Sequence, residues 1–168
     1  MKLTVNQGNS QGIGWPVSGL FLLVMLYWSG YIMIIKPSDI VKMTLAPFLI
    51  FLLDEVLYNF WPDFSLTWHL DNYLHIMGGM SIAASSIVAL RIAERGGWVK
   101  INSAATFFVV VAFVMSAAVV WEFYEFLHDY FYGTHFQPSN ADTVKDLFMG
   151  LTGGAAWCLG HLARRKTN

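Results

Sequence analysis

Residues 103–127 read SAATFFVVVAFVMSAAVVWEFYEFL, and the segment carries no charged side chain before Glu122. An apolar run of roughly 20 residues is what a helix needs to cross a hydrocarbon core of about 30 Å. A strand is not expected, because lipid-exposed strands must close into a barrel and this run does not alternate between apolar and polar residues. The segment therefore predicts a membrane-spanning helix.

Four similar apolar runs accompany it, separated by breaks that contain proline or glycine: residues 15–36, 43–61, 72–93 and 143–163. Only 12% of the residues are charged and the mean hydropathy is +0.51, whereas soluble domains carry about 25% charged residues. The first run is longer than the apolar part of a signal peptide and lacks an A-x-A cleavage pattern, so we expect it to be retained. The sequence predicts an all-α fold: one transmembrane domain, residues 1–168, forming a polytopic helical bundle of about five transmembrane helices.

The basic residues lie mostly at one side of these spans. This side carries eight of the ten: Lys36, Lys42, Arg91, Arg95, Lys100, Arg164, Arg165 and Lys166. The other side keeps Lys2 and Lys145. Because lysine and arginine concentrate in cytoplasmic loops, the pattern predicts an N-outside, C-inside topology. We expect a multi-pass membrane protein whose main partner is the lipid bilayer, and no nucleic-acid binding.

The acidic residues have the opposite distribution, and insertion rules do not require it. By their spacing, three sets each share one face of a predicted helix: Asp71 with His75, Asp142 with Asp146, and Glu122 with Glu125 and Asp129. Asp54 lies near the middle of its span, where a charge costs at least about 2.5 kcal/mol. This concentration of acids calls for a chemical explanation.

Glu122 and Glu125 carry the strongest signal among these acids. They lie at the C-terminal end of their helix, where the helix dipole disfavours carboxylates, and at this spacing they repel each other. A bound cation, protonation of the carboxyls, and hydration at the interface remain three open explanations.

Helix capping offers an alternative for the other acids. Asp71, Asp142 and Asp146 lie in predicted first turns, where carboxylates accept hydrogen bonds from free N–H groups. Thr143 together with Asp146 reads as a capping box.

Oxygen ligands with one imidazole suit Mg, Mn, Fe or Zn. We therefore expect a divalent metal site at the extracytoplasmic face, built by His75, Glu122, Glu125, Asp142 and Asp146. Asp71, Asp129 and Asp54 are expected as additional ligands or as partners of the ligands. A cysteine-based metal motif is not possible with the single Cys158.

Glycines continue the same helix faces. Gly78 and Gly79 follow His75, and Gly150, Gly153 and Gly154 follow Asp146. Small residues allow close helix packing in lipid, so these segments are expected to approach each other.

Three motifs in a fixed order carry a resemblance to a known family: Asp71-Asn-Tyr-Leu-His75, Glu122-Phe-Tyr-Glu125, and Asp142-Thr-Val-Lys-Asp146 followed by Gly150. Over roughly residues 50–160 the chain resembles the YjdF-like proteins, an uncharacterised family of bacterial inner-membrane proteins. A looser similarity to VanZ-like proteins rests on D-x-x-x-H alone. The resemblance implies a multi-pass protein of the bacterial inner (plasma) membrane with a shared polar site and no particular reaction.

A metal at the extracytoplasmic face of the membrane could activate water for hydrolysis of a lipid-linked or headgroup substrate. The sequence leaves open whether the protein is an enzyme, and it identifies no catalytic residue. A second hypothesis is a cation- or proton-conducting component, which Asp54 and Glu55 favour because a permeation route needs polar groups below the interface. A third is an accessory subunit of a larger membrane complex.

Overall fold

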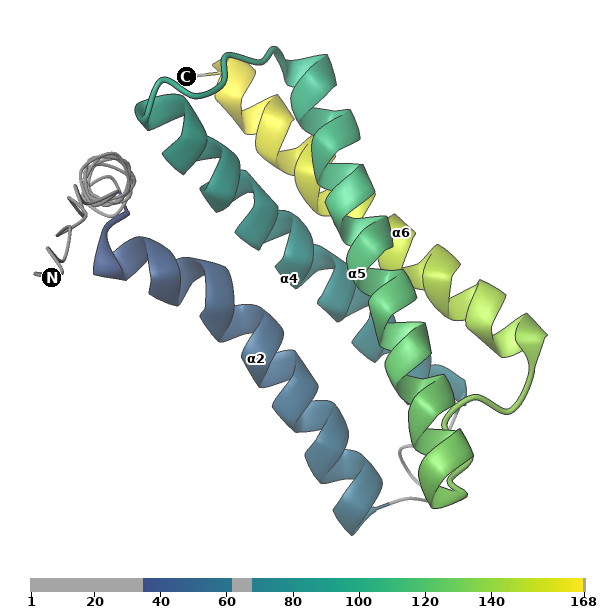
Figure 1. The fold of residues 1–168 in the computed structure, drawn as a ribbon. Coiled ribbons are helices and arrows are strands. Elements are labelled where there is room, and N and C mark those ends of the chain that lie inside the picture. The colour runs from purple at the N-terminus through teal and green to yellow at the C-terminus, as the bar shows by residue number, and fades with distance from the viewer. Residues whose placement is uncertain (1–34, 62–67, 168) are drawn as a thin grey trace, which may run out of the picture. The chain divides into compact units, whose positions relative to one another are not determined.

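The computed structural model describes residues 35–61 and 68–167, and within them the chain forms four helices and no strand. The helices are α2 (Pro37–Phe60), α4 (Trp68–Arg95), α5 (Ser103–Tyr132) and α6 (Asn140–Thr167), as Figure 1 shows. All four belong to one compact unit, Lys36–Asn168. The all-α prediction is confirmed for this part of the chain, whereas the predicted span 15–36 lies almost entirely outside it.

Two of the described helices are long and apolar enough to cross a membrane: α4 from Leu70 to Arg95, and α5 from Ser103 to Tyr132. The predicted runs 43–61 and 143–163 fall within α2 and α6 apart from residue 61, but neither helix meets the same requirement of length and composition. The described residues therefore support two candidate spans and a helical bundle.

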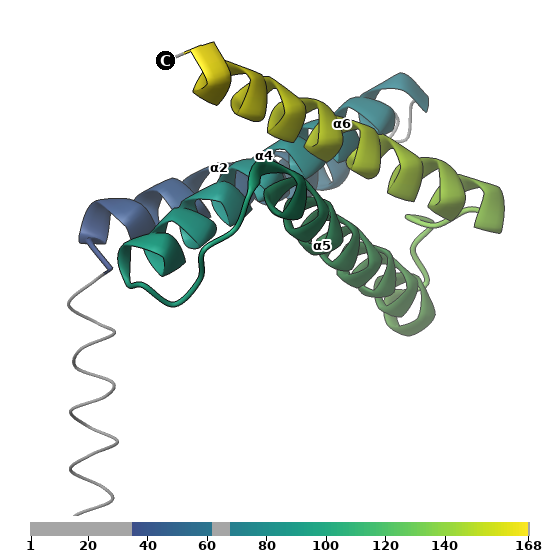
Figure 2. The ribbon, with the colours of Figure 1, turned by 90° about the horizontal axis from the view of Figure 1, so that it is seen from above.

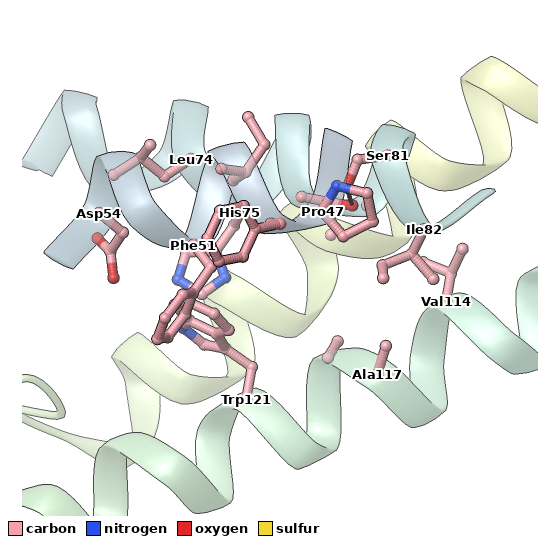
Figure 3. A pocket seen from close by; sticks show the side chains of 16 residues that line it. Pro47, Phe51, Asp54, Leu74, His75, Ser81, Ile82, Val114, Ala117 and Trp121 are labelled. Carbon is pink, nitrogen blue, oxygen red and sulfur yellow. Dashed lines mark hydrogen bonds between the residues drawn. The ribbon is translucent and has the colours of Figure 1, made fainter. Parts of the chain in front are cut away.

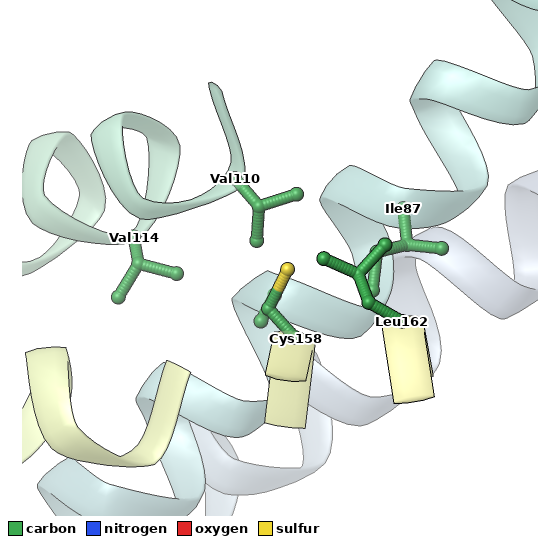
Figure 4. Close-up of a cluster of buried hydrophobic side chains, with 6 residues drawn as sticks. Ile87, Val110, Val114, Cys158 and Leu162 are labelled. Atoms are coloured by element: carbon green, nitrogen blue, oxygen red, sulfur yellow. The ribbon is translucent and has the colours of Figure 1, made fainter. Parts of the chain in front are cut away.

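Helix α4 is the centre of this unit, because it packs against α2, α5 and α6 (Figure 1). Helices α5 and α6 also contact each other and run at an angle to one another, as Figure 2 shows. The buried apolar cluster joins α4, α5 and α6 through Ala83, Ile87, Val110, Val114, Cys158 and Leu162 (Figure 4).

Glycines set the distance between α4 and α6. A Cβ placed on Gly79 would lie 2.0 Å from the carbonyl oxygen of Gly150, and one on Gly153 would lie 2.1 Å from the carbonyl oxygen of Ile76. Because real Cβ atoms do not approach this closely, only glycine permits the contact, which confirms the predicted close packing. His75 and Asp146 each lie four residues, about one turn, before Gly79 and Gly150, so this contact holds them at the same depth.

The ends of α5 and α6 follow capping rules. Asn102 Oδ1 accepts a hydrogen bond from Ala105 N at 2.8 Å, and α5 ends at Gly133, whose φ of 67° suits glycine. Helix α6 begins at Asn140, and Ser139 Oγ accepts from Asp142 N at 3.2 Å. The predicted capping box of Thr143 is therefore wrong: Ser139 starts the helix earlier and places Thr143 inside it.

At the other end of the unit, side-chain contacts join the start of α2 to α4, and α4 to α6. The Arg95 guanidinium pairs with the buried carboxylate of Asp39, which precedes the predicted span 43–61. The hydrogen bond from Arg95 holds the pKa of Asp39 below its usual 3.8. Arg91 Nη2 lies 3.1 Å from His161 Nε2. This end also carries the exposed Arg164, so the described basic residues other than Lys145 gather here, as the sequence predicts.

Candidate metal centre

Asp71, His75 and Asp146 form a cluster where the N-terminal parts of α4 and α6 meet. One ligand atom from each residue can be chosen so that all lie within 4.8 Å of one another. His75 Nε2 lies 3.2 Å from Asp71 Oδ1 and 3.9 Å from Asp146 Oδ1. Two ligands on opposite sides of one ion are separated by about 4.0–5.2 Å, depending on the metal. The three residues are therefore close enough to one another to share an ion.

Asp146 is the most buried member of this cluster, with 2% of its surface exposed. Its Oδ1 atom has no hydrogen-bond partner among the described residues, although Lys145 Nζ lies 3.3 Å away. A buried carboxylate oxygen without a hydrogen bond costs free energy, because it has lost its water without replacement. Asp146 Oδ1 therefore has coordination capacity beyond its ion pair with Lys145, and it lies beside His75.

Lys145 connects this cluster to Asp142. Its Nζ atom lies 2.7 Å from Asp142 Oδ1 and 2.9 Å from Asp71 Oδ2. Lys145 and Asp142 lie three residues apart on α6, and the lysine side chain is only 14% exposed. The lysine is thus a cation already placed between the acids, and Asp142 is its partner rather than a member of the three-residue cluster.

Glu122 and Glu125 are buried, with 5% and 6% of their surfaces exposed. Glu125 Oε1 accepts a hydrogen bond from Trp121 Nε1 at 2.8 Å, and Glu122 Oε2 accepts from Gln137 Nε2 at 3.0 Å. Glu122 Oε1 has no hydrogen-bond partner in the described part of the chain. Glu125 is close enough to interact electrostatically with His75, but neither glutamate belongs to the cluster of three.

Asp129, predicted as an additional ligand or a partner of the ligands, accepts hydrogen bonds from the loop that follows α5. Its Oδ1 accepts from Thr134 Oγ1 at 2.6 Å and from Phe136 N at 2.8 Å, and its Oδ2 accepts from Gln137 N at 2.9 Å. Both carboxylate oxygens therefore hold the loop between α5 and α6. The same loop contains Gln137, whose side chain donates a hydrogen bond to Glu122.

A cavity of about 320 Å³ lies between α2, α4 and α5 and reaches the cluster through His75. Figure 3 shows Asp54 of α2, His75 of α4 and Trp121 of α5 around this cavity. Its other walls are mainly apolar and include Phe51 and Val114. Asp54, predicted as an additional ligand, is therefore a neighbour of the cavity and stands outside the cluster of three.

The structure brings three of the eight predicted ligands into one cluster, and the other five lie outside it, with Asp142 joined to it through Lys145. Sequence reasoning missed the position of Lys145 among the acids. A signal was present, because Lys145 follows Asp142 by three residues and directly precedes Asp146. The i, i+3 spacing of opposite charges predicts their pairing on a helix.

Comparison with known proteins identifies the family to which this chain belongs. Neither a curated protein nor a solved structure matches the chain. Residues 17–167 match a family of membrane proteins, a range that contains all four described helices and all the carboxylates discussed above. This agrees with the apolar composition and with the two candidate spans. The chain belongs to the family described as "Predicted membrane protein (DUF2238)".

Proposed function

We propose that this membrane protein binds a divalent cation through Asp71, His75 and Asp146. The observation that carries the proposal is the Asp146 carboxylate, which is 2% exposed and has an oxygen without a hydrogen bond beside two further ligands. Two carboxylates and one neutral imidazole balance the charge of a divalent ion. This donor set suits Mg, Mn, Fe or Zn and leaves coordination positions for water.

Charge balance at this end of the unit supports a bound cation. The described residues here include eight carboxylates and one lysine: Asp54, Glu55, Asp71, Glu122, Glu125, Asp129, Asp142 and Asp146, with Lys145. Lys145 and Asp142 neutralise each other at 2.7 Å. With His75 neutral, Asp71 and Asp146 then keep two negative charges, which a divalent ion would offset.

The proposed membrane topology places this site outside the cytoplasm. Five spans, with the N-terminus outside and the C-terminus inside, put the ends of the helices that carry Arg95 and Arg164 in the cytoplasm of a bacterium and the cluster at the opposite face of the inner membrane. The order in which the three acidic motifs follow one another in the sequence supports kinship with the YjdF-like proteins.

Hydrolysis of a lipid-linked or headgroup substrate is the reaction that this site would serve best. A divalent ion lowers the pKa of its bound water and polarises phosphoryl or carbonyl oxygens. Glu122, with one oxygen free of hydrogen bonds, and Glu125 would support the site as buried acids beside it. Asp71, His75 and Asp146 would hold the ion.

Metal content of the detergent-purified protein tests the proposal. The wild type is expected to bind one divalent ion per chain after equilibration with Zn²⁺ or Mn²⁺ and removal of excess metal. Asp146→Asn is expected to lose at least about tenfold in affinity, because even residues that only orient ligands contribute 10–100-fold. Asp54→Asn, outside the cluster, is the matched control and should keep the ion. Equal, substoichiometric metal in all three proteins would refute the cation site.

The position of Asp54 favours a second candidate, a cation- or proton-conducting component. Asp54 and His75 line the same cavity. Glu55, the residue after Asp54 on α2, accepts a hydrogen bond from Tyr124 of α5. These acids extend the polar region from the cluster along α2. If Asp54→Asn keeps the bound metal and abolishes ion or proton flux in liposomes, conduction is the better description.

A further inference from the structure

We infer that the cavity between α2, α4 and α5 holds the hydrocarbon chain of a membrane lipid, whose oxygen-bearing headgroup points toward His75. The inference rests on the proposed cation site, because His75 belongs both to the cavity and to the cluster with Asp71 and Asp146. It names the substrate class of that site as an amphiphile with one chain inserted between the helices.

The size and lining of the cavity suit a hydrocarbon chain. Its volume of about 320 Å³ lies in the range of ligand pockets, which begins at about 300 Å³. Phe48, Phe51, Ile82, Val114 and Ala117 are among its walls. Apolar cavities as small as about 150 Å³ stay dry and take up apolar molecules, so a chain of methylene groups is a better occupant than water.

The two ionisable side chains of the cavity, Asp54 and His75, lie toward one end, and Ser81 farther along donates its hydroxyl to Gly78 O at 2.7 Å. Ile82 lies seven residues after His75 on α4, which is about 10 Å along the helix axis, and Pro47 lies seven residues before Asp54 on α2. In Figure 3, Asp54 and His75 lie toward one end and Ile82 and Val114 toward the other. This polarity matches a molecule with one polar and one apolar end.

The buried core closes the apolar end of the cavity. Val114 lines the cavity and also belongs to the buried cluster with Val110 and Cys158 (Figure 4). A chain entering beside His75 would therefore meet packed side chains about two helical turns further along α4.

The cavity also reaches the outer surface of α2. Phe48 is 57% exposed and Phe51 is 38% exposed, and both line the cavity. With α4 and α5, the two candidate membrane spans, crossing a bilayer, lipid chains would lie next to this surface. A chain from the surrounding bilayer would need to move only between α2 and α5 to enter.

Filling the cavity tests the inference. A Cβ on Gly78, which lines the cavity, would meet no atom within 4 Å, so Gly78→Leu adds an apolar side chain without a backbone clash. Gly160→Leu is the matched control, because its Cβ also meets nothing and Gly160 lies outside the cavity. Ala117→Phe narrows the cavity from α5 and serves as a second filling variant.

The probe is a phosphatidylglycerol whose acyl chain carries a diazirine, incorporated into vesicles of phosphatidylethanolamine and phosphatidylglycerol. In the reconstituted wild type, photolysis should label peptides that contain Ile82 or Ala117. Labelling of these peptides should fall at least tenfold in Gly78→Leu and in Ala117→Phe and stay unchanged in Gly160→Leu. Labelling at Phe108, which is 70% exposed and outside the cavity, gives the background in each protein.

Two outcomes would overturn the inference: cavity labelling that is equal in the wild type and in monodisperse filled variants, or cross-links from residues 15–36 of this chain to the cavity. Metal analysis of the same samples separates the two proposals. If Gly78→Leu loses the cavity labelling but retains the metal, the chain site is supported. If Asp146→Asn retains the cavity labelling, the chain site is supported as well. Cavity labelling in proteins that all lack metal supports the chain site and overturns the cation site alone.

Discussion

Buried carboxylates have different partners at the two ends of the helical unit. At the basic end, Asp39 is 6% exposed and pairs with Arg95. At the acidic end, Asp146 is 2% exposed, yet one of its oxygens has no hydrogen bond within the described structure. Burial of a charge is costly unless the charge is paired. Asp39 has an arginine partner, whereas Asp146 shares one cation, Lys145, with Asp71 and Asp142.

The contact between α4 and α6 should be the most sensitive part of this arrangement. Gly79→Ala would place a Cβ 2.0 Å from the carbonyl oxygen of Gly150, and overpacking of this kind costs about 3 kcal/mol. We expect a large loss of monodisperse protein and a lower unfolding temperature in detergent. The adjacent Gly78→Ala is the control: its Cβ meets open space, and alanine favours a helix by about 1 kcal/mol. Equal stability of the two variants would contradict the packing described here.

Lys145→Met separates a salt-bridge network from a cation site. If the acidic end exists to bind a divalent ion, removal of the lysine eliminates a competing charge near Asp71 and Asp146. Metal affinity should then rise about tenfold, which corresponds to about 1.4 kcal/mol. Isothermal titration of the metal-free protein with Mn²⁺ or Zn²⁺ measures the change. A variant that loses stability and binds no metal would show that Lys145 is the only cation this cluster requires.

Acid should weaken the basic end through the pair of Asp39 and Arg95. Because Arg95 holds the pKa of Asp39 below 3.8, the pair stabilises the folded state fully above the pKa of the unfolded chain. That contribution is lost as pH falls through the lower pKa of the folded state. The unfolding temperature of the wild type should therefore drop more between pH 5 and pH 3 than that of Asp39→Asn. Parallel pH profiles for the two proteins would rule out this role of the pair.

The helices themselves were accessible from the sequence, because their signals are local. Apolar runs broken by proline and glycine predicted the positions of all four described helices, and Gly133 marked the end of α5. The gathering of basic residues at one end also followed from a simple count. The start of α6 was missed because Ser139 and Thr143 are both good N-cap residues, and spacing alone does not decide between them.

The composition of the site was only partly predictable, because spacing places residues on a helix face and does not determine which faces meet. Asp71 and His75 share one face, but their approach to Asp146 depends on the close contact of Gly79 and Gly150 between two helices. Glu122 drew attention through the helix dipole, which shows that a carboxylate is unusual without identifying its partner. In the structure that partner is Gln137 of the following loop.

The smallest expected effect concerns the cap of α5 near the basic end. Asn102 Oδ1 accepts a hydrogen bond from Ala105 N at 2.8 Å, so Asn102→Ala leaves one helix N–H group without that partner. Such a change costs about 1 kcal/mol, and the unfolding temperature should fall slightly with metal binding unchanged. Asn102→Asp keeps the acceptor and should restore the stability. If Asn102→Ala instead altered metal affinity, the two ends would be coupled through α5. The inference that each end stabilises its buried carboxylates independently would then be wrong.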